Sequence, residues 1–496
     1  MESPAAPESA QAKSSCARAV LLDLALLLAA ALVCYLPNLS AEYRWASHED
    51  RHTLIAAEMA ETGDYFFPTL LGEPYSYKPP VLHSAAVSLF SVFGGPSMLL
   101  ARLPSVVAAA IAIGALYGIG RQLATRSAAL LTSLVLVVIP GWSNMARQAR
   151  PDMILAMAIV TASFLLLAGM SARRAFQRAA LFAGAGLACG LGVLTKGPYG
   201  ILFPLTFAIV APFEKRTLSR PSLREWSLFG ALVLLLPLGW ALPVYLRDSG
   251  VYLKSVLFNK DLTEGAAGHS RPFYWYLGTA VSSTTPWFLL LPVAYEELRR
   301  RFSASAVTSI AILVVLSCVP GKRLHYLLPW YPFAALAGVS AATRLSPRFP
   351  WVTKAISIGA AAALLCTSFY FGFAEKRWFS PIEPRCELAR ALLSQAPTNS
   401  NFICLDGASE AIALVGRIEY GHRRGRVRQR KPSDDLAAEV ERARHEQRPC
   451  ILLVPDEHLQ LVRAQLADYP IVTIFHGTIE ERSFEGWRIA GDALKK

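Results

Sequence analysis

Charged residues are scarce in this chain. Aspartate, glutamate, lysine and arginine make up only 17% of its 496 residues, whereas hydrophobic residues make up 53%. The mean hydropathy is +0.36. Soluble domains usually carry about 25% charged residues, so this composition excludes a soluble globular protein and predicts a polytopic membrane protein.

Cysteine is also scarce, with eight residues, and no Cys/His spacing is typical of a closed zinc site. Cys386, Cys404 and Cys450 fall in the C-terminal region, where an oxidising compartment would permit a disulfide. Their odd number and the strand-like runs around Cys404 and Cys450 favour buried thiols instead. We predict no metal ligands and no certain cofactor, and a divalent metal stays open.

Long apolar runs dominate the first 375 residues. A membrane span needs about 20 apolar residues, and the sequence predicts about eleven transmembrane helices. Their ranges are 19–37, 97–119, 127–145, 153–170, 179–195, 199–213, 226–246, 273–295, 304–320, 324–342 and 352–374. We expect the first span to be retained, because its apolar run continues to Leu36 without a convincing small-residue cleavage site.

The net charge of +13 is explained by topology, and nucleic-acid binding is an unnecessary interpretation. Short arginine- and lysine-rich loops fall on one side of successive spans, and by the positive-inside rule that side is cytoplasmic. Residues 1–18 would then be a cytoplasmic tail, 19–374 a transmembrane domain, and 375–496 an extracytoplasmic domain. Within that last domain, runs at 401–406, 450–455 and 471–475 alternate with helical stretches, which predicts a small α/β fold.

The remaining polar clusters all fall on the opposite, extracytoplasmic side. Charge beside apolar helices is costly unless water, a partner or a substrate compensates it, so this convergence indicates one site. The clusters are His48-Glu49-Asp50-Arg51, Lys78, Arg147/Arg150/Asp152, Lys196, Asn259-Lys260-Asp261, His269/Arg271 and Lys322-Arg323-His325-Tyr326. Any one of these residues, taken alone, could instead cap a helix or anchor a loop at the membrane interface, with no part in a functional site.

The loop after the first span carries the densest of these clusters. Residues 49–62 mix apolar and charged residues and predict a short amphipathic helix along the membrane surface. A carboxylate or histidine here could take a proton from an acceptor hydroxyl. Arg51, Lys78, Lys196 and Lys322 are suited to phosphate oxygens.

An ordered series of short motifs carries a family resemblance. It runs from Ile55-Ala-Ala-Glu58-Met59 and Lys78-Pro79 through Arg150-Pro-Asp152 and Leu194-Thr-Lys196-Gly197 to Tyr326-Leu-Leu-Pro329. The chain resembles the GT-C superfamily of membrane glycosyltransferases that use polyprenyl-phosphate sugars. It is most similar to the bacterial lipid A aminoarabinose transferase branch, related to the protein O-mannosyltransferases.

This resemblance implies a GT-C fold and an inverting sugar transfer at the outer face, with a first-loop acidic pair near the reacting sugar. It places Arg51, Lys78 and Tyr326 around the donor phosphate, where Lys196 and Lys322 would join them. Two positions depart from the family pattern. His48 stands where aspartate is expected, and Tyr77 stands where glutamate is usual before Lys78.

We therefore expect an inner-membrane glycosyltransferase whose partners are a polyprenyl (undecaprenyl) phosphate sugar, membrane lipids and an envelope acceptor: lipid A, a glycan, a lipid or a protein. Glu49 is the first choice for the base or for positioning the acceptor, supported by His48, Asp50 and Asp152. Arg150, His269 and Arg271 are assigned to the acceptor or to other contacts. The alternatives are a non-catalytic assembly or lipid-binding protein and a lipid-linked sugar flippase or transporter, for which we find no clear internal repeat.

Overall fold

The chain forms two compact units. The computed structural model describes residues 7–41, 47–257, 270–375, 384–405, 409–420, 426–479 and 482–489. One unit, which we call the helical unit, comprises Met1–Leu39, Ser76–Val81 and Arg102–Glu375. The other, the α/β unit, comprises Ser40–Tyr75, Leu82–Ala101 and Lys376–Lys496. Much of the first loop therefore belongs to the same compact unit as the C-terminal residues.

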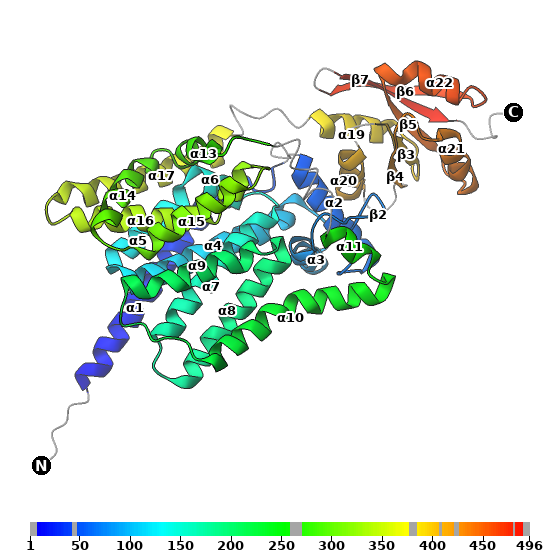
Figure 1. Cartoon of the computed structure of the whole chain (residues 1–496). Helices are drawn as coiled ribbons and strands as arrows, with labels where there is room; N and C mark the ends of the chain where they lie inside the picture. Colours follow the sequence, from blue (N-terminus) through cyan, green and yellow to red (C-terminus); the bar gives the residue numbers. More distant parts are fainter. Residues whose placement is uncertain are drawn as a thin grey trace, which may run out of the picture. The chain divides into compact units, whose positions relative to one another are not determined.

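Six helices are long and apolar enough to cross a membrane (Figure 1). They are α1 (Pro7–Tyr35), α4 (Met98–Leu123), α7 (Pro151–Ser171), α8 (Ala175–Lys196), α10 (Leu223–Asp248) and α17 (Pro350–Phe369), which continues as the π-turn η5 (Tyr370–Ala374). The polytopic α-helical fold predicted from composition is thereby confirmed.

Two expected spans are broken by sharp bends. The range 127–145 forms α5 (Arg126–Val138) and α6 (Pro140–Ala146), which meet at 66°. The range 273–295 forms α13 (Trp275–Thr284), then η3 (Trp287–Leu289) and α14 (Leu290–Arg300), with a bend of 116°. Pro140 and Pro286 stand at these breaks, where a proline removes a backbone donor and restricts the preceding residue.

Three further expected spans form shorter helices: α9 (Tyr199–Glu214), α15 (Ala304–Cys318) and α16 (Trp330–Leu345). The last begins after the 3₁₀ turn η4 (Leu324–Leu327), so the expected span 324–342 is not one continuous helix. By length and composition, six of the described helices could cross a membrane, or eight if each bent pair is one span. The other three expected spans correspond to these shorter helices of 15 or 16 residues.

Glycine contacts fix the position of α8 against its neighbours. A Cβ atom on Gly186 would lie 2.5 Å from the Phe229 carbonyl oxygen, and one on Gly190 would lie 2.7 Å from that of Val233. Small residues allow membrane helices to approach closely in this way, and α7, α8 and α10 lie side by side (Figure 1). The helix ends immediately after Lys196, at Gly197, whose φ of +74° favours glycine.

The α/β unit contains a five-stranded mixed sheet in the order β4-β3-β5-β7-β6 (Figure 1). Its strands are β3 (Asn401–Cys404), β4 (Val427–Gln429), β5 (Cys450–Pro455), β6 (Ile471–Ile479) and β7 (Arg482–Ile489). Strand β3 runs parallel to β4 and β5, whereas β7 is antiparallel to β5 and β6. The predicted α/β fold and three of its strands are confirmed, while β4 and β7 were not predicted.

Helices cover both faces of this sheet. Ile451 and Leu453 of β5 pack in a cluster with α19 (Pro384–Gln395) and α20 (Ser409–Tyr420). Leu452, which alternates with them, packs with α21 (Leu436–His445) and α22 (Leu459–Gln465). A strand that is covered on both faces typically consists of a continuous run of apolar residues.

The expected free thiols are confirmed, since Cys386, Cys404 and Cys450 are buried and unbridged.

The predicted first-loop helix exists as α2 (Ser47–Thr62), but its apolar residues face protein. Leu54, Ile55 and Met59 are fully buried, and Leu54 belongs to the same cluster as α19 and α20. The apolar face of this helix therefore packs against protein. A short hairpin follows, β1 (Thr69–Leu70) with β2 (Glu73–Pro74), and then α3 (Val81–Phe93).

Candidate functional site

Asp152 is a buried carboxylate at the start of α7. Pro151 occupies the first helical position, so Asp152 lies in the first turn, where the helix dipole favours negative charge. Its side chain is only 4% exposed. A buried charge must be paired, and Lys196, the last residue of α8, donates a hydrogen bond to Asp152 Oδ1.

His325 lies on the other side of the same carboxylate. Its Nε2 is 4.0 Å from Asp152 Oδ2, and its Nδ1 is 3.3 Å from a guanidinium nitrogen of Arg150. Because arginine can only donate, Nδ1 is the acceptor and Nε2 of the neutral ring carries the proton that faces Asp152. Burial lowers the pKa of His325 to about 3, against the opposing effect of Asp152, which agrees with a neutral ring.

Lys78 and Tyr326 complete this group. The Lys196 ammonium lies 3.8 Å from the centroid of the Tyr326 ring, a cation–π contact. Burial lowers the pKa of Lys78 to about 8, because the positive charges of Lys196 and Arg150 add to desolvation while Asp152 opposes them. We call Lys78, Arg150, Asp152, Lys196, His325 and Tyr326 the Asp152 cluster. All six lie in the helical unit.

Three cationic side chains and one carboxylate therefore share this cluster, which leaves an excess of positive charge. Lysine and arginine donors that converge in a poorly solvated site favour an anion with several acceptor oxygens. Gln148 also contributes, since its Oε1 accepts a hydrogen bond of 2.7 Å from Arg150 Nε. The sequence alone did not indicate a role for Gln148, because its hydrogen bond with Arg150 depends on the conformation of the turn that contains both residues.

Lys322 and Arg271 belong to a neighbouring pair of loops. Ser270 and Gly321 form an isolated antiparallel bridge, and the Arg271 amide donates to the Pro320 carbonyl at 3.4 Å. The ammonium of the buried Lys322 donates a hydrogen bond of 2.6 Å to the Val319 carbonyl, which lies in the same loop. His269, Asn259, Lys260 and Asp261 lie outside the described residues.

The first-loop residues lie in the α/β unit, not in the unit that holds the Asp152 cluster. Glu49 and Asp50 are buried in the first turn of α2, whose backbone also includes His48. Arg51 Nε is 2.9 Å from Glu410 Oε1 of α20. The guanidinium expected at a donor phosphate is therefore paired with a carboxylate in this structure.

Two residues have structural roles that the sequence did not indicate. Glu58 is 4% exposed and accepts hydrogen bonds from Thr69 Oγ1 and from the Leu71 and Gly72 amides, so it organises the hairpin. Arg147, expected in the polar site, is fully buried. It donates to the Tyr35 and Pro37 carbonyls at 2.7 and 2.6 Å.

No group of three or more His, Cys, Asp or Glu side chains within the described ranges is arranged to hold a metal ion. A buried histidine pair does exist in the α/β unit, where His52 Nδ1 is 2.9 Å from His83 Nε2.

The helix arrangement and the charged cluster at the ends of α7 and α8 define an integral membrane protein with the GT-C fold. The solved structure of ArnT from Cupriavidus metallidurans in the apo state has a TM-score of 0.72 at 17% identity, covering 95% of this chain and 98% of that one. The structure of the same protein bound to undecaprenyl phosphate has a TM-score of 0.69 at 18% identity, covering 94% and 97%.

Sequence comparison agrees with this assignment. The dolichyl-phosphate-mannose-protein mannosyltransferase family profile matches residues 77–240. The undecaprenyl phosphate-alpha-4-amino-4-deoxy-L-arabinose arabinosyl transferase of Pseudomonas aeruginosa (strain UCBPP-PA14) is 31% identical over 338 residues, which cover 64% of this chain and 60% of that relative. The match thus spans about 60% of the relative's length. The fold of this chain is therefore the GT-C fold that its motif order predicted.

Proposed function

We propose that this protein is an inverting glycosyltransferase of the inner membrane that moves one sugar from a polyprenyl-phosphate donor to an envelope acceptor. The observation that carries this proposal is the excess of positive charge around Asp152, contributed by Lys78, Arg150 and Lys196. A departing lipid phosphate gains negative charge during transfer, and fixed cations stabilise it in a site that excludes water.

Within the cluster, each side chain has a distinct proposed role. Lys78, Lys196 and Tyr326 would bind the donor phosphate, and Arg150 would be held in position by Gln148 and His325. Asp152 would act as the counter-ion that allows the cations to gather, because it is already engaged by Lys196. Lys322 remains a second candidate for the phosphate.

Glu49 remains our proposal for the base or for positioning the acceptor hydroxyl, with His48 and Asp50 beside it. Its burial in the first turn of α2 supports a group with a defined orientation. Arg51 would contact the donor phosphate only if its ion pair with Glu410 were broken and replaced by a contact with that phosphate.

The names of similar proteins support the choice of donor and acceptor classes. One solved relative is described as bound to undecaprenyl phosphate, and curated relatives are named as undecaprenyl-phosphate aminoarabinose transferases. We propose an undecaprenyl-phosphate-like donor and an acceptor among lipid A, glycans, lipids and proteins. The distribution of arginine and lysine supports a cytoplasmic N-terminus and an extracytoplasmic C-terminal domain.

The test is donor consumption by the purified full-length protein. We would incubate it with a panel of polyprenyl-phosphate sugars and cell-envelope extract, and follow free polyprenyl phosphate by mass spectrometry. We expect wild-type protein to release polyprenyl phosphate and Lys78→Ala to lose this activity. Lys354→Ala, which changes an exposed lysine at the start of α17, is the matched control and should retain it.

The same assay separates the alternatives. Correctly folded protein that binds a donor without releasing its sugar would be a lipid-binding protein. Protein in vesicles that moves an intact lipid-linked sugar between leaflets would be a flippase. Either result, or full activity of Lys78→Ala, would overturn the proposed function.

A further inference from the structure

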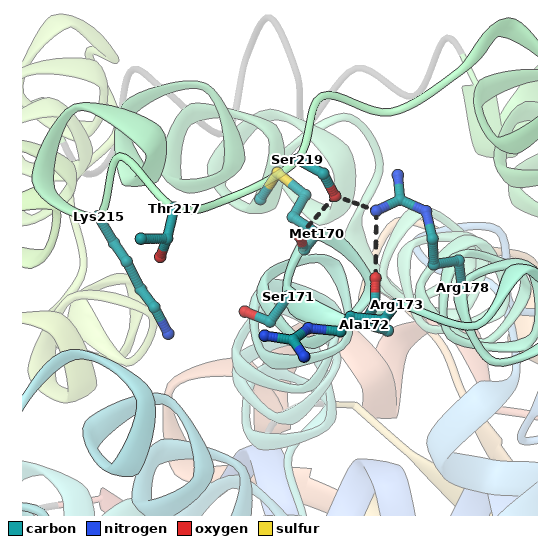
Figure 2. A pocket seen from close by; sticks show the side chains of 8 residues that line it. All are labelled: Met170, Ser171, Ala172, Arg173, Arg178, Lys215, Thr217 and Ser219. Carbon is teal, nitrogen blue, oxygen red and sulfur yellow. Dashed lines mark hydrogen bonds between the residues drawn. The ribbon is translucent and has the colours of Figure 1, made fainter.

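A second basic site lies at the other ends of α7 and α8. A cavity of about 410 Å³ is bounded by the end of α7, the α7–α8 loop and the α9–α10 loop (Figure 2). Its lining residues are Met170, Ser171, Ala172, Arg173, Arg178, Lys215, Thr217 and Ser219. These eight include three cations and no carboxylate.

One of the three cations is already compensated. Arg178 binds Glu225 with two nitrogens, at 2.6 and 2.9 Å, and also donates to Ser219 Oγ and the Ala172 carbonyl. Glu225 in turn accepts from the Ser222 amide at the start of α10. This pair ties the two loops together and leaves the charge of Arg178 neutralised.

Arg173 and Lys215 are not neutralised in this way. Arg173 is exposed, and the described hydrogen bond of Lys215 goes to the Gln122 carbonyl, at 3.2 Å. Their side chains extend toward the space around Ser171 (Figure 2). An ammonium has three donors and a guanidinium five, so most of this hydrogen-bonding capacity is available to an anion, as is the Thr217 hydroxyl.

The cavity is remote from the Asp152 cluster. Helix α7 has 21 residues, which at 1.5 Å per residue separate its two ends by about 30 Å. That distance matches the hydrocarbon thickness of a bilayer. The cavity and the Asp152 cluster therefore lie at opposite membrane faces and cannot share one phosphate.

Exposed apolar side chains place the cavity at headgroup level. Phe176, Phe213 and Leu223 are 87%, 66% and 82% exposed, and they stand at the ends of α8, α9 and α10 that border these loops. Exposed arginines surround them at positions 174, 216, 220 and 224. Apolar anchors beside cationic side chains are typical of the bilayer interface.

We propose that this cavity binds the phosphate group of an anionic membrane lipid, with Arg173, Lys215 and Thr217 as its donors. Basic pockets between membrane helices recognise such head groups by charge and hydrogen bonding. The proposal does not rest on the glycosyltransferase function, since it concerns a different end of the helices and different side chains.

Binding of short-chain lipids to the detergent-purified full chain tests this proposal. Thermophoresis would be measured with dioctanoyl phosphatidylglycerol, with zwitterionic dioctanoyl phosphatidylcholine, and with glycerol 3-phosphate as a soluble phosphate. The main variant is Arg173→Gln, because this exposed side chain can be changed without disturbing packing, and Lys215→Gln is the second. Arg216→Gln and Arg224→Gln, exposed on the same face but outside the cavity lining, are matched controls.

We expect phosphatidylglycerol to bind at least tenfold more weakly to Arg173→Gln and to Lys215→Gln, with both controls unchanged. Phosphatidylcholine should bind weakly to every form. Equal weakening by Arg216→Gln would indicate a diffuse surface charge effect and overturn the site, as would loss of binding in Lys78→Ala alone. Glycerol 3-phosphate that binds as tightly as the lipid, with the same dependence on Arg173, would overturn the lipid assignment in favour of a soluble phosphate.

Discussion

Lys196 donates a hydrogen bond to Asp152 Oδ1, and the two residues stand at adjoining ends of consecutive helices. Lys196 is the last residue of α8, and Asp152 is in the first turn of α7. A short connection at residues 172–174 makes these helices antiparallel neighbours. The ion pair is therefore created by the helical hairpin itself.

Asp152→Asn should destabilise the protein by about 3 kcal/mol, because it leaves buried cations without their counter-ion. The double variant Asp152→Asn/Lys196→Met should recover most of this loss, since it removes the unpaired charge as well. Thermal unfolding in detergent, followed by intrinsic fluorescence, measures the coupling of the two changes. Additive losses in the double variant would show that the pair is not coupled.

Donor affinity should weaken at alkaline pH. The pKa of Lys78 is lowered to about 8 by burial, so this lysine is mostly charged at pH 7 and mostly neutral at pH 9. We expect the Kd for a short polyprenyl phosphate to rise about tenfold per pH unit above 8. Arg remains charged throughout this range, so any binding retained by Lys78→Arg should lack the alkaline loss. An identical pH profile for both proteins would contradict a role for the Lys78 charge.

The Arg51–Glu410 pair allows a structural role of Arg51 to be separated from phosphate binding. The side chains are 37% and 17% exposed, so Glu410→Gln should cost less than about 1 kcal/mol of stability and preserve donor consumption. If Arg51 contacts the donor phosphate, Arg51→Gln should abolish consumption at unchanged folding. Matching small effects of the two substitutions would instead assign Arg51 to the contact between α2 and α20.

Glu439 should stabilise the C-terminal sheet in a pH-dependent manner. Burial alone would raise the pKa of Glu439, but hydrogen bonds from Arg430 and the charge of Arg428 outweigh it and lower the pKa. A depressed carboxyl pKa stabilises the fold at neutral pH, and this contribution is lost as pH falls below the usual carboxyl range. Glu439→Gln should therefore cost about 2 kcal/mol at pH 7.

Hydrogen exchange of the full chain would measure this loss at β3 and β4. The difference between wild type and Glu439→Gln should persist down to the ordinary carboxyl pKa of 4.5 and shrink only below it, where the carboxyl takes up its proton. A difference that stays constant with pH would mean that the carboxylate charge is not responsible. Glu441→Gln, a neighbouring and more exposed glutamate on α21, is the matched control.

The sequence predicted the class of fold because apolar run length and loop charge depend on the membrane alone. It also predicted that Lys78, Asp152 and Lys196 would be on one side, and the structure brings these residues together. It could not predict the bends at Pro140 and Pro286, since the hydropathy on either side of each bend continues without interruption.

The contacts that the first loop makes with the rest of the chain could not be predicted from the sequence either. Glu410 is 359 residues from Arg51, and neither side chain has a local pattern that points to the other. Strand β4 has only three partly exposed residues, two of them polar, so no hydrophobic alternation marks it. Such elements acquire their structure from the neighbouring strand and not from their own composition.

The glycine contacts of α8 limit where residues can be inserted into or deleted from this chain. Because Gly186 and Gly190 meet the backbone of α10, they fix both the depth and the rotation of the helix that ends at Lys196. Removing one residue between Gly190 and Lys196 would turn the ammonium by about 100° and draw it back by about 1.5 Å. Length changes are therefore tolerable in the loops but not in this segment, where the count of residues matters as much as their identity.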